Sequence, residues 1–157
     1  MIDHIFVFAH EDPAIQQIEK TYKNAVKATT APLEADEVEI CKVPKNLANP
    51  EDLDFIYKDS WTEYSTFKLH TLKSKEATVI EQLWNQFPVE RGLGALCHNP
   101  GYVLRFKKNG QSQITTSICW QCGNFRYWNG EQYSSLSAFD VQSDVAQSLL
   151  ALLSSHF

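Results

Sequence analysis

Two Asn-Gly dipeptides constrain the fold of this chain more than any other feature of its sequence. Asn109-Gly110 and Asn129-Gly130 each lie between strand-like runs of apolar, aromatic and β-branched residues. Asn and Gly are the residues that most readily adopt the positive φ angles of a tight β-hairpin turn. The two dipeptides therefore predict an antiparallel meander with two Asn-Gly hairpins in the C-terminal half of the chain.

The side-chain pattern around the first dipeptide suggests a register for that hairpin. A three-residue loop over 108–110 sets Leu104 opposite Ile114. The same loop sets Tyr102 opposite Thr116. A two-residue loop would mix polar and apolar side chains on each face, because side chains alternate between the two faces of a sheet. We therefore expect the three-residue loop.

Helical segments are expected beside this sheet. Signals for a helix start, in which a capping residue precedes a proline or an amphipathic run, occur at Asp12-Pro13, Asn49-Pro50, Ser74 and Ser137–Asp140. Further strand-like runs cover 1–9, 38–43 and 64–72. The prediction is an α+β fold, with an antiparallel sheet packed against three to four helices, the last of them C-terminal.

Composition limits the classes of function open to the chain. Hydrophobic residues make up 43% and charged residues 21% of the 157 positions, as in a single globular domain over 1–157. The apolar run at 1–9 follows no basic leader and is too short to cross a membrane, so we expect a cytoplasmic protein with no membrane partner. The net charge of −5, with −7 in residues 1–64, disfavours nucleic acid as a partner.

Four cysteines are the main candidates for special chemistry: Cys41, Cys97, Cys119 and Cys122. The last two form a C-x-x-C-G segment, which occurs in zinc knuckles. A thioredoxin-type redox motif needs its first thiol at the N-terminus of a helix, where the helix dipole lowers the thiol pKa. Strand-like runs flank this segment on both sides, so the sequence gives no support to a thioredoxin-type motif.

A zinc site remains an alternative. Continued pairing before Pro100 would place Cys97 on the same face of the sheet as Cys119, and a bulge near Gly123 would displace Cys122. Cys97, Cys119 and Cys122 are therefore the alternative metal ligands. A structural zinc site normally shows two compact ligand pairs, and only one is present. We expect no cofactor and no stoichiometric zinc.

The cysteines belong to a longer pattern. Leu96-Cys97-His98-Asn99-Pro100 precedes Leu104-Arg105-Phe106 and Ser117-Ile118-Cys119-Trp120-Gln121-Cys122. This order resembles small bacterial proteins of unknown function, in which a Cys-x-x-Pro-Arg-His segment precedes an Ile-Cys-Phe-x-Cys strand. The resemblance implies a bacterial origin and a shared α+β fold, and it implies no function. Gly101-Tyr102 replaces the Arg-His pair, so a site that depends on that pair would be missing here.

The sequence lacks the motifs of common enzyme classes. Gly92-Leu93-Gly94 has neither the third glycine of a dinucleotide loop nor the Lys-Ser/Thr of a phosphate loop. No Gly-x-Ser-x-Gly elbow is present, and the five histidines include no pair at i, i+4 spacing. We therefore expect a non-catalytic protein.

Acidic and aromatic residues favour a protein-binding role. The acidic residues with this expected role are Glu34, Asp36, Glu37, Glu39, Asp52 and Asp54, and the aromatic anchors are Trp128 and Tyr133. An acidic surface attracts a basic partner, and exposed Trp and Tyr are typical anchors of interfaces. The prediction is an immunity-type or antitoxin-type inhibitor of a basic toxin protein. The alternative is a thiol-site or zinc-site protein with a regulatory or enzymatic role.

Overall fold

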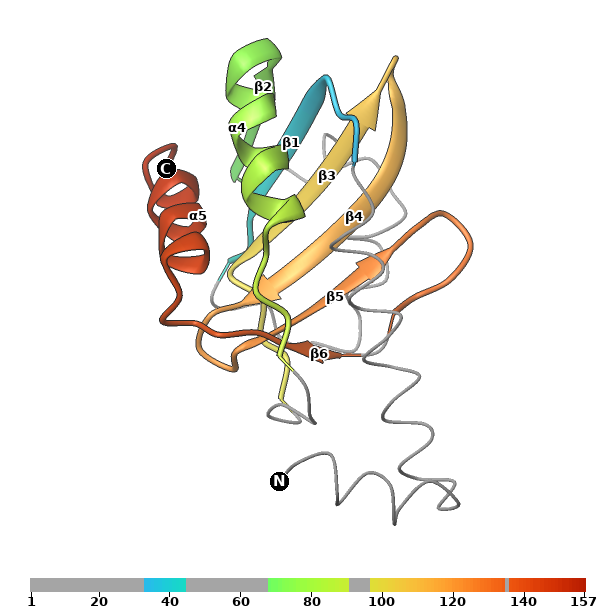
Figure 1. The fold of residues 1–157 in the computed structure, drawn as a ribbon. Helices are drawn as coiled ribbons and strands as arrows, with labels where there is room; N and C mark the ends of the chain where they lie inside the picture. The colour runs from blue at the N-terminus through green and yellow to red at the C-terminus, as the bar shows by residue number, and fades with distance from the viewer. Residues whose placement is uncertain (1–32, 45–67, 91–96, 135) are drawn as a thin grey trace.

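The structure is a computed structural model that describes residues 33–44, 68–90, 97–134 and 136–157. These residues form a six-stranded sheet with the strand order β2-β1-β3-β4-β5-β6, together with two helices (Figure 1). Every strand pairing in it is antiparallel. The elements are β1 (Glu37–Lys42), β2 (Lys68–Lys73), α4 (Ser74–Asn85), β3 (Tyr102–Lys108), β4 (Gln111–Cys119), β5 (Asn124–Trp128), β6 (Ser137–Ala138) and α5 (Asp144–Ser154).

The α+β class and the antiparallel sheet are confirmed. The predicted strands at 38–43 and 64–72 correspond to β1 and, in their described part, to β2. The predicted strand at 1–9 and the helices expected after Asp12-Pro13 and Asn49-Pro50 lie outside the described residues. Within the described residues, no helix is long and apolar enough to span a membrane.

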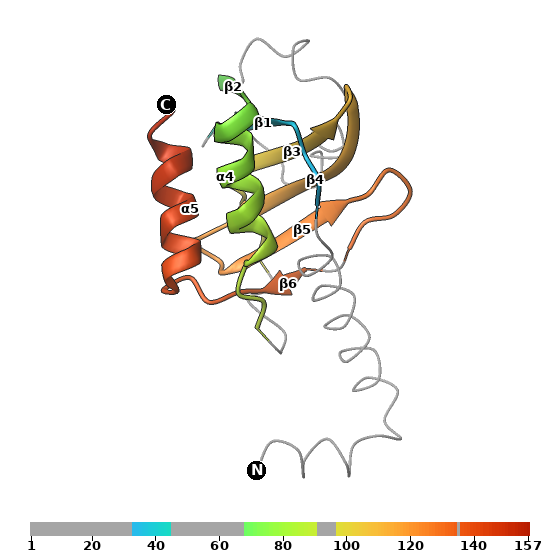
Figure 2. The same cartoon turned by 45° about the horizontal axis from the view of Figure 1, so that its top comes forward.

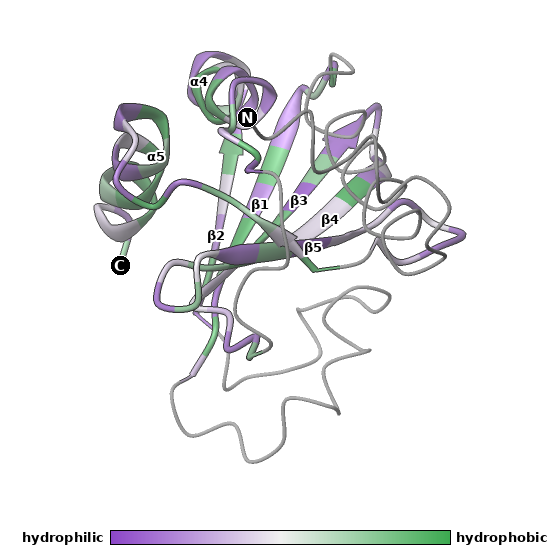
Figure 3. Ribbon diagram, turned by 60° about the horizontal axis from the view of Figure 1, so that its bottom comes forward, coloured by the Kyte–Doolittle hydropathy of each residue, from purple (hydrophilic) through white to green (hydrophobic). Residues whose placement is uncertain are grey.

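Both described helices cover the same face of the sheet (Figures 1 and 2). Along the strands, hydrophilic and hydrophobic residues alternate, so that one face is apolar (Figure 3). Trp84 of α4 and Leu149 of α5 are fully buried against this face. They belong to one core cluster with the sheet residues Val38, Ile40, Leu104, Phe106, Ile118 and Phe125, all of them 0% exposed. Burial of these side chains provides the main stabilisation of the fold.

The predicted register of the first hairpin is wrong, although the predicted faces are right. Asn109 and Gly110 both have positive φ angles, 51° and 79°, and form a two-residue turn between β3 and β4. The pairing then shifts between Phe106 and Lys107, so that Leu104 lies opposite Thr116. The bulge adds one residue to β4 and thereby restores the alternation that the loop alone would break.

The predicted starts of both described helices need correction. No side chain caps α4, whose N-cap residue is Lys73 instead of the predicted Ser74. No helix begins at Ser137–Asp140 as predicted, because Ser137 and Ala138 form the short strand β6 and a turn follows. The cap of α5 is Ser143, whose hydroxyl accepts a hydrogen bond from the Ala146 N–H at 3.2 Å.

Candidate thiol site

A tight turn between β4 and β5 holds two of the cysteines. Cys119 is the last residue of β4, and Gly123 reverses the chain with a φ of 67°. The Gly123 N–H donates to the Cys119 carbonyl oxygen at 2.9 Å, and the Cys122 N–H donates to the Cys119 sulfur at 3.0 Å. On a regular strand, Cys119 and Cys122 would face opposite sides of the sheet. A turn brings them together instead, so the predicted bulge near Gly123 is wrong.

The segment that precedes β3 brings a third cysteine to this turn. The Asn124 side-chain amide donates to the Cys97 carbonyl oxygen at 2.6 Å, and this places Cys97 beside the turn that carries Cys119 and Cys122. Burial raises the pKa of Cys122 to about 12, and the neighbouring thiols of Cys97 and Cys119 act in the same direction. Cys122 therefore stays protonated at neutral pH. We call Cys97, Cys119 and Cys122 the thiol site.

The cysteines differ in exposure. Cys97 is exposed, Cys122 is half-buried, and Cys119 is 1% exposed. The fourth cysteine, Cys41, is fully buried in β1, and burial raises its pKa to about 12. A thiol reacts as a thiolate that a reagent can reach. Cys97 is therefore the thiol of the site that an external reagent meets first.

A chain of polar side chains holds Cys97 beside the turn. Asn124, at 0% exposure, donates from its side-chain amide to the Cys97 carbonyl oxygen at 2.6 Å. Its amide oxygen lies 2.7 Å from Nδ1 of His98, and Nε2 of His98 lies 2.7 Å from the Ser117 hydroxyl. An amide oxygen only accepts, so Nδ1 carries the proton and Nε2 accepts from Ser117. We call Asn124, His98 and Ser117 the His98 clamp.

Ser117, His98 and Asn124 are linked in the order of a nucleophile, a base and an orienting group. Their burial shows that the links hold the structure together. Burial lowers the pKa of His98, and the nearby Arg126 charge lowers it further, so the ring is neutral. Ser117 is 1% exposed and lies inside β4, paired with Val103 on one side and Arg126 on the other. Its hydroxyl therefore has no route to a substrate. The clamp fixes the segment 97–99 against the sheet.

Sequence reasoning missed the clamp because its members are far apart along the chain. His98 lies 19 residues from Ser117 and 26 from Asn124. The available signal was a buried polar residue, Asn124, immediately after the C-x-x-C-G segment. Such a residue requires hydrogen-bond partners.

The predicted sharing of one sheet face by Cys97 and Cys119 is not seen. Pairing does not continue before β3, and Cys97 lies outside the strands. The thiols meet through the turn and the clamp instead. Within the described part of the chain, no three His, Cys, Asp or Glu side chains converge as metal ligands, and this applies to the three thiols as well.

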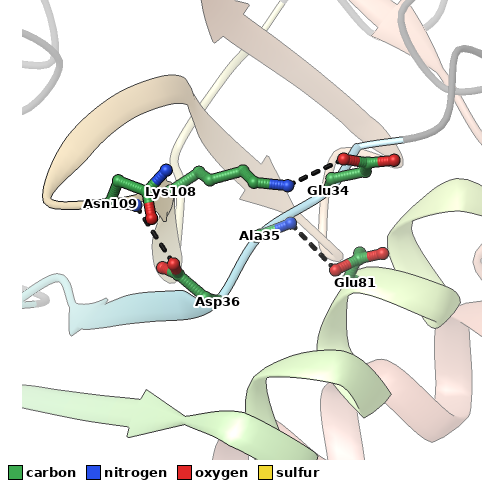
Figure 4. A network of polar contacts seen from close by, with 6 residues as sticks. All are labelled: Glu34, Ala35, Asp36, Glu81, Lys108 and Asn109. Atoms are coloured by element: carbon green, nitrogen blue, oxygen red, sulfur yellow. Dashed lines mark hydrogen bonds and ion pairs between the residues drawn. The ribbon is translucent and has the colours of Figure 1, made fainter.

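The predicted acidic surface is largely engaged in contacts within the chain (Figure 4). Glu34 pairs with Lys108 at 2.7 Å, and Asp36 accepts a hydrogen bond from the Asn109 N–H at 3.0 Å. Glu39 is paired with Lys107 and, at 3.9 Å, with Arg105. These contacts join the start of β1 to the β3–β4 hairpin. Glu37 is half-buried, and Asp52 and Asp54 lie outside the described residues.

The predicted aromatic anchors lie together on the loop that follows β5. Trp128 and Tyr133 form an isolated bridge that closes this loop, and their ring centroids are 4.6 Å apart. The Arg126 guanidinium lies 4.4 Å from the centroid of the Tyr133 ring. All three side chains are half-buried. The predicted second hairpin at Asn129-Gly130 is thus a four-residue loop between two bridged aromatic residues.

A cavity of about 400 Å³ lies beside the start of β3. Its lining residues are Val43, Pro44, Asn99, Pro100, Gly101, Tyr102, Trp120, Gln121 and Leu150. The Tyr102 hydroxyl is bonded to the Ser154 hydroxyl, and the Trp120 N–H donates to the Ala146 carbonyl oxygen. Among the described residues, the cavity lining includes no carboxylate, histidine or cysteine.

The fold and the thiol site place this protein among α+β proteins with clustered cysteines. Comparison with the models of known protein families, with curated proteins and with solved structures finds no match. The site itself is therefore the basis for a functional proposal.

Proposed function

We propose that the protein acts through its thiol site as a regulatory thiol protein. The observation that carries this proposal is the placement of Cys97 beside the turn of Cys119 and Cys122, with Cys97 exposed and Cys122 half-buried. Once Cys97 carries a mixed disulfide, a neighbouring thiol can attack the Cys97 sulfur and release the other half of that disulfide as a thiol. In this role, covalent modification of the Cys97 thiol would regulate the protein.

The surroundings of the site suit this role. Cys119 is buried and Cys122 is half-buried, so the first reaction with an external reagent falls to the exposed Cys97. Cys97 begins the segment that runs into β3 at the centre of the sheet. A modification there would act on the clamp and on the β4–β5 turn together.

The proposal can be tested with a small aromatic disulfide added to the folded protein. We expect one thiol to exchange rapidly, and we expect Cys97→Ser to remove this fast phase. Cys41→Ser is the matched control and should retain it, because Cys41 is fully buried. If the fast phase survives in Cys97→Ser, or if no thiol reacts before the protein unfolds, the proposed function is wrong.

The second candidate function is the protein-binding role, and the aromatic pair favours it. Trp128, Tyr133 and Arg126 are the three residue types most enriched among interface hot spots, and they form one half-buried group. The partner would be a basic protein, as for an immunity-type inhibitor. Since Glu34, Asp36 and Glu39 are engaged within the chain, anchoring would depend on the aromatic residues.

A capture experiment with extracts of the source organism tests this candidate. For a captured basic protein, Trp128→Ala should cost about 2 kcal/mol or more of binding free energy, mainly through faster dissociation. Val79→Ala is the control, because Val79 is a hydrophobic residue of α4 that is 46% exposed. Equal affinities for the two variants would exclude the aromatic pair as the anchor.

A further inference from the structure

We infer that a small neutral peroxide oxidises Cys97 and that Cys122 then closes a disulfide with it, held in position by Asn124. This inference rests on the thiol function proposed above, and it specifies the oxidant, the partner thiol and the positioning residue. Each of the three assignments follows from a separate feature of the site.

Cys97 is the thiol that the oxidant reaches first, because it is exposed while Cys119 is 1% exposed. Its thiolate attacks one oxygen of the peroxide and the O–O bond breaks. The sulfur becomes a sulfenic acid, and the other oxygen leaves as hydroxide or alkoxide, which takes up a proton. The peroxide is reduced and Cys97 is oxidised by two electrons.

Cys122 is the thiol that resolves the sulfenic acid. It lies in the turn beside which Asn124 holds Cys97, and it is half-buried, whereas Cys119 is 1% exposed. The thiol of Cys97 also contributes to the raised pKa of Cys122. The Cys122 sulfur attacks the Cys97 sulfur, the S–O bond breaks, and the departing hydroxide leaves as water with the Cys122 proton. Overall, two thiols and one peroxide give one disulfide and two hydroxyl products, which are two water molecules for hydrogen peroxide.

The chemistry around the site favours a neutral oxidant. The groups that act on the pKa of Cys122 are the thiols of Cys97 and Cys119 and the backbone of Asn99, all of them uncharged. The adjacent His98 ring is neutral as well, because burial lowers its pKa. Arg126, whose charge acts on His98, is bonded to the Ser134 carbonyl oxygen and lies over the Tyr133 ring, so the contacts described for the thiols include no cation to attract an anionic oxidant.

Asn124 positions the pair because it links both cysteine-bearing segments. It directly follows the turn that carries Cys122, and it donates to the Cys97 carbonyl oxygen at 2.6 Å. Its amide oxygen holds the ring of His98, the next residue along the chain from Cys97. With 0% exposure, its side chain has little freedom to move. Disulfide closure requires a narrow range of distances between the two cysteines, so loss of this link should slow it.

Hydrogen peroxide added to the full-length, reduced protein tests the assignment. We expect the mass to fall by two hydrogen atoms, and a peptide map without reductant to join the segments of Cys97 and Cys122. In Cys122→Ser, the sulfenic acid should persist at Cys97 and react with dimedone. Cys41→Ser should behave as the unmodified protein does. A Cys119–Cys122 disulfide in the map would overturn the assignment of the pair.

The positioning role has its own test. Asn124→Ala should slow disulfide closure by on the order of tenfold or more, because closure depends on the relative placement of two groups. The alkylation rate of Cys97 depends on the exposure and ionisation of that thiol and not on its distance from Cys122, so it should change much less. His98→Ala is a second variant that removes the ring but leaves the Asn124 bond to Cys97. Its rate of disulfide closure should lie between that of the unmodified protein and that of Asn124→Ala. If Asn124→Ala is folded and closes the disulfide at the unmodified rate, the positioning role is wrong.

The outcomes also separate this inference from the proposed function. If Cys97 exchanges with an aromatic disulfide but peroxide produces no Cys97–Cys122 bond, only the inference fails. If Cys97 is unreactive toward both reagents, the proposed function fails with it.

Discussion

At the residue scale, the four cysteines share one chemistry and differ in their surroundings. Cys41 is enclosed between β3 and β2, where its neighbours across the strands are Val103 and Leu69. Cys119 is nearly as buried, and its sulfur accepts a backbone N–H. Of the four, only Cys97 and Cys122 have access to solvent, and Asn124 holds Cys97 beside the turn that carries Cys122. Burial therefore determines which of the four thiols can react with an external reagent.

Cys41 should make the protein sensitive to alkaline pH. Burial raises its pKa to about 12, whereas the thiol of the unfolded chain ionises near pH 8.5. The folded state thus favours the protonated thiol, and this stabilisation is complete below about pH 8.5 and is lost as the pH rises toward 12. The loss should approach about 1.4 kcal/mol per pH unit within that window.

Urea unfolding under reducing conditions at about pH 8 and about pH 10 measures this effect. The Cys41→Ala variant should lose less stability between the two values than the unmodified protein, because it has no thiol to ionise there. Identical losses in the two proteins would show that Cys41 does not supply the effect.

His98 should act in the opposite direction on the pH scale. Burial lowers its pKa in the folded protein, so the unfolded chain binds a proton more readily below about pH 6.5. The stabilisation from neutral His98 is complete above about pH 6.5 and is lost as the pH falls toward the lowered pKa of the folded state.

We expect the free energy of unfolding to fall between about pH 7 and about pH 5.5, and to fall less in His98→Asn, which has no group that titrates in this window. Denaturant unfolding at the two pH values, with Cys41→Ser as a control that retains His98, measures the difference. A pH dependence unchanged in His98→Asn would contradict the neutral, buried state of the ring.

At the scale of the elements, β1 shows how a run of acidic residues can serve the fold. The sequence places Glu34, Asp36 and Glu39 close together and suggests a solvated acidic surface. The antiparallel pairing of β1 with β3 sets Lys107 opposite Glu37, and the next residue, Lys108, pairs with Glu34. The acidic residues therefore neutralise basic residues of the neighbouring strand, which no count of charge along the sequence can reveal.

Two acidic residues of this run provide a matched comparison. The side chain of Glu39 is 12% exposed and pairs with Lys107 and Arg105, whereas Glu34 is 78% exposed. Solvent screens the pairs of Glu39 only weakly, so Glu39→Gln should cost about 2 kcal/mol of unfolding free energy. Glu34→Gln should leave the stability unchanged, because solvent screens an exposed pair.

Denaturant unfolding of both variants at neutral pH gives the two values. Equal effects would mean that the Glu39 pair is as well solvated as the Glu34 pair. A large effect of Glu34→Gln alone would assign the stabilising role to the link with the β3–β4 hairpin.

At the scale of the whole molecule, the sequence predicts which side chains lie on the buried face of the sheet, but it does not predict the thiol site. Alternation in β3 and β4 assigns Leu104, Phe106 and Ile118 to the core, and all three are fully buried. The register of the same hairpin was wrong, because a bulge adds a residue without a strong sequence signal. The thiol site depends on contacts between Cys97, Asn124 and the turn, which form only when distant segments fold together.

The thiol site also connects to the stability of the whole fold. A disulfide between Cys97 and Cys122 would close a loop of about 25 residues that contains β3, β4 and their hairpin. In the chain-entropy description, such a loop stabilises the folded state by about 3.5 kcal/mol, because it removes conformations mainly from the unfolded chain. For a protein of this size, that gain corresponds to a rise of about 10 °C in Tm.

We therefore expect the peroxide-treated protein to unfold at a higher temperature and a higher urea concentration than the reduced protein, and a thiol reductant to reverse both changes. The same treatment should not stabilise Cys122→Ser, which cannot form the bond, whereas Cys41→Ser should respond fully. Scanning calorimetry and urea unfolding of the three proteins, each reduced and oxidised, measure the effect. A disulfide that forms but lowers Tm would show that Cys97 and Cys122 must be strained to meet, and it would contradict the placement of the two thiols by Asn124.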